Sequence, residues 1–121
     1  TARILADEPA DFFANAFFLP AVLSDEYDKY WTDARIDKVL DVMAANGIAL
    51  EISARYEIPS KYILQKAKDK GLKFVFGTNN AGAEYYMLKY CAQMVNELGL
   101  TPNDMWFPTM STRKARLDII K

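Results

Sequence analysis

The sequence of 121 residues contains no histidine and a single cysteine, Cys91. Without histidine, the chain lacks the side chain that most often binds metal ions, acts as a general base or titrates near neutral pH. A single cysteine excludes an internal disulfide, and the lack of histidine excludes a Cys-His catalytic pair. A histidine-dependent active site is therefore excluded for this chain on its own.

The sequence also lacks an excess of either charge and a long apolar run. Its 15 Lys and Arg against 16 Asp and Glu give a net charge of −1 without a basic block, so we expect no nucleic-acid partner. No apolar run approaches the roughly 18 residues of a membrane span, and no signal-peptide pattern opens the chain, so we expect no membrane partner. Thr1 stands where an initiator Met is expected. We therefore expect upstream sequence that holds any targeting signal, and the compartment stays open.

What is present is a globular composition with a repeated helix-and-strand pattern. Apolar residues make up 51% and charged residues 26%, which indicates a single domain over residues 1–121. A helix from a Thr32 cap to Gly47 precedes an apolar strand at residues 48–52, and a helix from a Ser60 cap to Gly71 precedes a strand at 73–76. A third helix ends at Gly99, and its expected inner stripe comprises Met87, Leu88, Cys91, Met94, Val95 and Leu98.

The ends of the chain complete this pattern. We expect a first strand at residues 11–14, a capped turn at 101–104 and a basic helix at 111–120. Helices alternating with short strands predict βαβ crossovers and a parallel sheet, so the expected fold class is α/β. Both edges of a three-stranded sheet would be open. Either upstream sequence completes a barrel, or the chain forms a homo-oligomer through these edges.

Polar residues follow the expected strands, where parallel sheets place their functional groups. The candidate ligand-binding residues are Asn15, Glu51, Ser53, Arg55, Thr78, Asn79 and Asn80. The alternative is that these positions are polar only because loops meet water, and that the asparagines serve turns.

Glu51 interrupts an apolar strand, and a buried carboxylate must be paired or hydrogen-bonded. An ion pair with Arg55 or Lys73 is the favoured interpretation, and metal ligation is the alternative. Arg55 could instead hold an anion, since its planar guanidinium suits phosphate or carboxylate. Cys91 is expected in the core. The acidic cluster of Asp25, Glu26 and Asp28 is expected in a solvated loop that packs through neighbouring aromatic residues, and a cation site is the less favoured alternative.

Two stretches resemble the PHP (polymerase and histidinol phosphatase) family. Residues 46–77, NGIALEISARYEIPSKYILQKAKDKGLKFVFG, resemble the later strands of PHP barrels, in which a strand of the type ALEI is followed by Pro-Ser, a helix and a strand ending in Gly-Ser/Thr-Asp-x-His. Residues 11–20, DFFANAFFLP, resemble an earlier strand of the type D-I-x-x-H-P. The resemblance covers roughly residues 8–108.

The resemblance implies that the chain is the C-terminal part of a distorted, TIM-like (β/α)7 barrel. It also implies hydrolysis of phosphate esters by water activated on zinc, manganese or iron. The family's ligand positions correspond here to Asn15, Asn79 and Ala81, so that half of the metal centre is lost. We therefore expect no metal cofactor in this chain, although the full-length protein could carry a divalent metal.

Three hypotheses follow. The first is an inactive PHP-like fragment that keeps a ligand site. The second is part of an active metal-dependent phosphoesterase whose other ligands lie upstream. The third is a non-enzymatic binding or interaction module with an open sheet.

Overall fold

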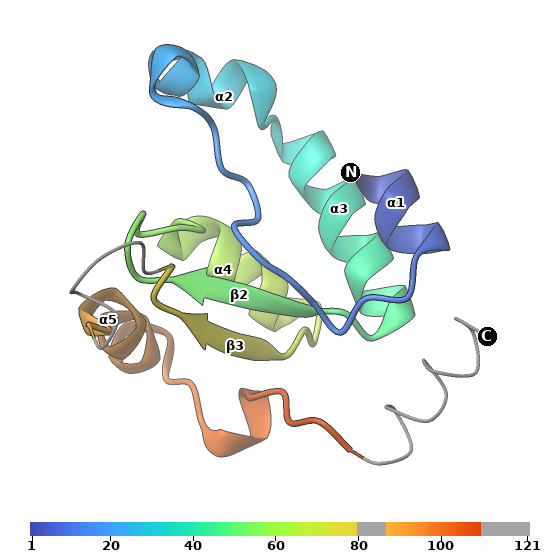
Figure 1. The fold of residues 1–121 in the computed structure, drawn as a ribbon, viewed down its shortest axis with the longest axis vertical. Helices are drawn as coiled ribbons and strands as arrows, with labels where there is room; N and C mark the ends of the chain where they lie inside the picture. Colours follow the sequence, from blue (N-terminus) through green and yellow to red (C-terminus); the bar gives the residue numbers. More distant parts are fainter. Residues whose placement is uncertain (80–86, 110–121) are drawn as a thin grey trace.

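The computed structural model describes residues 1–79 and 87–109, and Figure 1 shows how its elements are arranged. The strands are β1 (Phe12–Phe13), β2 (Ala49–Ser53) and β3 (Phe74–Gly77), and the 3-10 turns are η1 (Ala21–Glu26) and η2 (Pro102–Asp104). The helices are α1 (Ala2–Asp7), α2 (Tyr27–Tyr30), α3 (Asp33–Asn46), α4 (Lys61–Asp69) and α5 (Lys89–Leu98).

The three strands form one parallel sheet in the order β1-β2-β3. Leu50 of β2 lies opposite Phe13 on one side and opposite Phe74 on the other. The chain passes through α3 between β1 and β2, and through α4 between β2 and β3, which is the predicted βαβ arrangement. The predicted α/β class is thus confirmed, whereas the described residues form no closed barrel.

Glycine and serine end and begin the central helices where the sequence predicts. Gly47 adopts φ +63° after α3, a left-handed conformation that costs a residue without Cβ little, and Ile48 N donates to Met43 O at 2.9 Å. Ser60 Oγ accepts a hydrogen bond of 3.4 Å from Ile63 N and caps α4. Thr32 precedes α3 as predicted, but its side chain makes no capping hydrogen bond.

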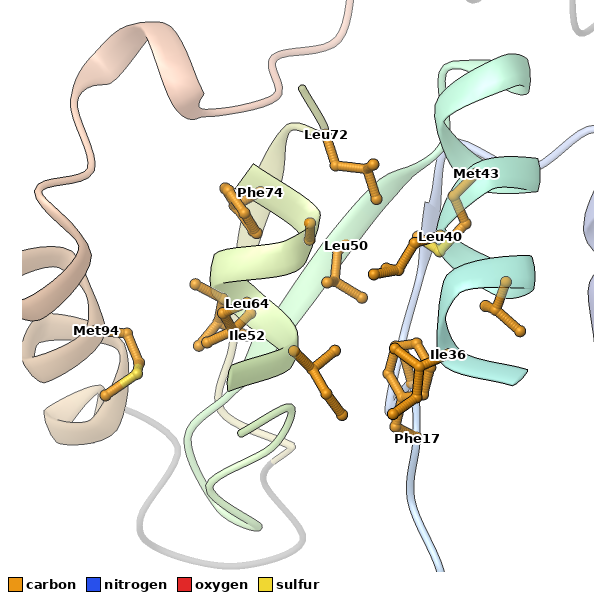
Figure 2. Close-up of a cluster of buried hydrophobic side chains, with 14 of the residues drawn as sticks. Phe17, Ile36, Leu40, Met43, Leu50, Ile52, Leu64, Leu72, Phe74 and Met94 are labelled. Carbon is orange, nitrogen blue, oxygen red and sulfur yellow. The ribbon is translucent and has the colours of Figure 1, made fainter. Parts of the chain in front are cut away.

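The core lies between the sheet and the helices that cover one of its faces. Figure 2 shows side chains of α3 and α4 directed toward Leu50, Ile52 and Phe74, with Met94 of α5 beside them. Burial of such side chains supplies most of the driving force for folding, roughly 1.5–3 kcal/mol each before opposing terms. The most deeply buried apolar side chains include Phe17, Leu40, Met43, Leu50, Ile52, Ile63, Leu64, Phe74, Cys91 and Met94.

Ion pairs join α3 to α4 on the solvent side. Asp37 lies 2.9 Å from Lys66 Nζ and 3.6 Å from Lys70 Nζ, Asp33 lies 3.4 Å from Lys66, and Asp41 lies 2.5 Å from Lys70. Residues four apart lie on the same face of a helix, so the aspartates of α3 face the lysines of α4 along both helices.

One edge of the sheet is partly covered, contrary to the expectation that both are open. Met105 forms a parallel bridge with Phe74, and Trp106 N donates to Phe74 O at 2.9 Å. The ring of Trp106 also lies 6.4 Å from that of Phe12, which belongs to β1 at the opposite edge. An aromatic side chain at one edge of the sheet therefore contacts one at the opposite edge.

The third helix begins later than predicted. Met87 and Leu88 precede α5 and are exposed, whereas Tyr90 is buried and its hydroxyl donates to Pro59 O at 2.6 Å. Cys91, Met94 and Leu98 are buried as predicted. Each strand also differs slightly from its predicted bounds, because β2 and β3 both start and end one residue later and β1 is only two residues long.

Two helical segments were not predicted. The α1 helix packs on α3 and buries Leu5, and the acidic cluster predicted as a loop forms η1 and α2. The prediction that aromatic residues anchor this cluster is correct, since the Trp31 ring packs edge-on against Phe17 at 4.9 Å. The helix predicted at residues 111–120 lies outside the described residues. In the described parts of the chain, no helix is long and apolar enough to cross a membrane.

Candidate functional site

The C-terminal ends of the strands bring together most of the polar residues that the sequence predicts for a site. Asn15 follows β1, Ser53 ends β2, and Thr78 and Asn79 follow β3. Parallel strands place these ends at one edge of the sheet. Asn80 and Ala81 lie outside the described residues.

Glu51 connects the first two strand ends. Its side chain is only 9% exposed, and its Oε2 accepts a hydrogen bond of 2.7 Å from the backbone N of Asn15. Such a bond to a carboxylate is short and about twice as strong as one between neutral groups. Glu51 thereby fixes the chain after β1 to the middle strand.

The favoured ion pair of Glu51 with Arg55 or Lys73 is wrong. Arg55 Nη1 donates to Asn79 O at 3.3 Å, and Lys73 Nζ donates to Asn103 O. Lys73 lies just before β3, whereas the Glu51 carboxylate lies near Gly77 at the other end of that strand. The length of the strand therefore separates the two charges.

Gly77 leaves the space that the Glu51 side chain fills. A Cβ atom at this position would lie 1.8 Å from Glu51 Oε1 and 2.6 Å from Glu51 Cδ. Glycine is thus required here for close approach of a side chain rather than for a left-handed turn.

The two asparagines complete the connection between the strand ends. Asn79 Nδ2 donates to Asn15 Oδ1 at 3.0 Å, and both residues have positive φ, +46° and +50°. Asparagine adopts this conformation more readily than most residues, so the turn interpretation of both asparagines also holds. Glu51, Asn15 and Asn79 form one hydrogen-bonded chain, which we call the strand-end network.

Ser53 and Cys91 lie beside this network in the protein interior. Ser53 is fully buried, and its Oγ has no hydrogen-bond partner among the described residues. Cys91 Sγ lies 3.2 Å from Ile52 O. Burial raises the pKa of the Cys91 thiol to about 11, with the Glu51 carboxylate adding to the rise and the Gly77 N–H opposing it. A neutral thiol at this depth is a packing group rather than a nucleophile.

Arg55 lies at the exposed rim of the site. Its guanidinium lies 5.6 Å from the ring centroid of Tyr56, which in turn contacts the ring of Phe18 at 5.0 Å. Neither Tyr56 nor Phe18 was predicted from the sequence, because the parallel strands place the two turns at one edge but do not indicate which aromatic rings meet there. Thr78 is half-buried between the strand and Asn79.

The described residues do not fit the metal centre that the resemblance implies. Nowhere in residues 1–79 and 87–109 do three His, Cys, Asp or Glu side chains gather as metal ligands would. Glu51 is the one acidic member of the strand-end network, and its Oε2 is committed to Asn15 N. The two amides of the network are bonded to each other.

Comparison of the chain with protein-family models, curated protein sequences and solved structures finds no match. The PHP resemblance accordingly stays a prediction.

Proposed function

We propose that this chain is a non-catalytic, PHP-like α/β unit, in which a hydrogen-bonded network replaces the metal centre of a phosphoesterase barrel. The strand-end network carries this proposal, because it joins the ends of all three strands without a metal ion. An amide has both a donor and an acceptor, so Asn79 can donate to Asn15 where two metal-ligand side chains would need a cation between them.

The unit keeps one group suited to binding an anion. Among the described residues, the exposed guanidinium of Arg55 donates one hydrogen bond, to Asn79 O, of the five that it can donate. Its planar geometry matches phosphate and carboxylate groups. We propose a small anionic ligand at this rim.

Metal content and hydrolysis together test the first half of the proposal. We expect no stoichiometric zinc, manganese or iron after dialysis without chelator, and no turnover of p-nitrophenyl phosphate with added Mn²⁺ or Zn²⁺ above the buffer rate. Bound metal with turnover that is lost in Glu51→Gln but kept in Glu57→Gln would overturn it. Such a result would favour an active phosphoesterase whose other ligands lie upstream.

Titration with inorganic phosphate, followed by amide chemical shifts, tests the second half. We expect saturable shifts around Arg55 that disappear in Arg55→Gln and persist in Arg35→Gln, whose guanidinium binds Tyr30 O elsewhere in the fold. Shifts of equal size in both variants would mean that phosphate has no specific site at this rim.

A further inference from the structure

A cavity lies away from the strand-end network, where α2 approaches the first turns of α3 and α4. Its volume is about 480 Å³, within the range of ligand pockets in proteins. Side chains of Tyr27, Trp31 and Tyr62 line it together with the carboxylates of Asp28 and Asp33.

Its aromatic walls are held in place by contacts within the protein. Tyr27 Oη donates to Phe17 O at 3.0 Å, and Tyr62 Oη donates to Asp33 Oδ1 at 2.9 Å. The ring of Trp31 packs edge-on against Phe17 at 4.9 Å. Rings fixed in this way need little ordering when a ligand enters, which favours binding.

Asp28 gives the cavity its unpaired negative charge. The described residues that line the cavity include two carboxylates, Asp28 and Asp33, and no Lys or Arg. Lys66 Nζ lies 3.4 Å from Asp33 Oδ1 and offsets that charge, so Asp28 is the carboxylate that remains to attract a cation. Burial raises the pKa of Tyr27 and the Asp28 charge adds to that rise, so the field of Asp28 acts on a wall of the cavity.

The chain itself places an ammonium group against this wall. Lys66 Nζ lies 5.4 Å from the centroid of the Tyr62 ring and 3.4 Å from Asp33 Oδ1. This is the geometry of a cation held by an aromatic face and a carboxylate. Asp28, Tyr27 and Trp31 line the same cavity, and the ion pairs of α3 and α4 do not involve them.

We propose that this cavity binds a small organic ammonium ion. Aromatic faces attract the cation through their quadrupoles, and Asp28 supplies the opposite charge. An inorganic anion would meet two carboxylates and no basic side chain of the lining. The inference is independent of the function proposed for the strand ends.

Calorimetric titration with choline and with its neutral isostere 3,3-dimethyl-1-butanol tests the charge requirement. We expect choline to saturate one site at millimolar concentration, at least about 10-fold more tightly than the isostere. Equal affinity for both compounds, no saturation by about 50 mM choline, or saturable binding of inorganic phosphate in this cavity would overturn the inference.

A variant with a matched control locates the site. Asp28→Asn is expected to weaken choline binding about 5- to 10-fold, because it removes the opposite charge. Asp69→Asn changes the same residue type outside the cavity and should leave the affinity unchanged. Equal losses in the variant and the control would contradict the assignment.

Discussion

Substitution of Gly77 by alanine tests the contact that organises the strand-end network. The new Cβ would lie 1.8 Å from Glu51 Oε1, so one of the two residues has to move. If the carboxylate turns away, it gives up the bond to Asn15 N, and a hydrogen bond to a charged group contributes about 1.5–3 kcal/mol. If β3 shifts instead, overpacking of a filled interior costs about 1–3 kcal/mol.

Both routes give the same expected loss in the free energy of unfolding, about 1–3 kcal/mol for Gly77→Ala. Urea denaturation followed by far-UV circular dichroism measures it. Glu51→Ala is destabilising by itself, because it leaves Asn15 N–H without its partner. The double variant should be hardly less stable than Glu51→Ala alone, because the clash is absent, with a coupling energy of at least about 1 kcal/mol.

Gly99→Ala provides the control for this cycle. Nothing lies within 4 Å of a Cβ at that position, and its φ of +60° makes alanine unfavourable for the backbone only. Its effect should add to that of Glu51→Ala within about 0.5 kcal/mol. A Gly77→Ala protein as stable as the wild type, or additive effects of Gly77→Ala and Glu51→Ala, would refute the proposed role of the contact.

Three further predictions concern other parts of the fold. The hydrogen bond from Lys66 lowers the pKa of Asp37 below its ordinary 3.8, so its contribution to stability is present above that pH and is lost as the pH falls through the lowered value. Thermal melts from pH 7 to pH 2 should therefore show a smaller acid-induced loss in Asp37→Asn than in the wild type, and identical slopes would contradict this. The Cys91 thiol, whose pKa burial raises to about 11, should not react with Ellman's reagent at pH 8 unless urea unfolds the protein; rapid reaction of the native protein would show that it is accessible. Because β1 ends the sheet and Phe12 is 45% exposed, we also expect self-association in sedimentation velocity as concentration rises, and a constant monomer at all concentrations would exclude it.

The fold was predictable where one local rule decides the outcome. Gly47 and Ser60 mark helix ends through backbone geometry and capping, which depend on a few neighbouring atoms. The alternation of apolar strands with periodic helices likewise depends on short windows of sequence. These signals sufficed for the α/β class and for the order of the main elements.

The predictions of the fold were wrong where contacts between residues distant in the sequence determine the structure. Leu88 fits the apolar stripe of the third helix by spacing, yet α5 starts after it and leaves it exposed. The segment with Trp31 carries no strong helix signal, and its contact with Phe17, which lies outside the segment, anchors it. No periodicity in the sequence contains that contact.

The site shows the same division. The convergence of Asn15, Glu51 and Asn79 could be predicted, because parallel strands end at one edge. The partner of Glu51 could not be predicted. Opposite charge suggested Arg55 or Lys73, whereas the observed donor is the backbone N–H of Asn15. Every residue except proline has such a donor, so composition and charge give no indication of which one a buried carboxylate will use.

This choice of partner bears on what the site can do. The Glu51 carboxylate accepts from the backbone N–H of Asn15, and the Asn79 amide donates to the Asn15 amide oxygen. A metal ion at that position would compete with the Asn15 N–H for Glu51 and would need both asparagines to break their mutual bond. The same bonds that hold the three strand ends together therefore oppose metal binding at this position.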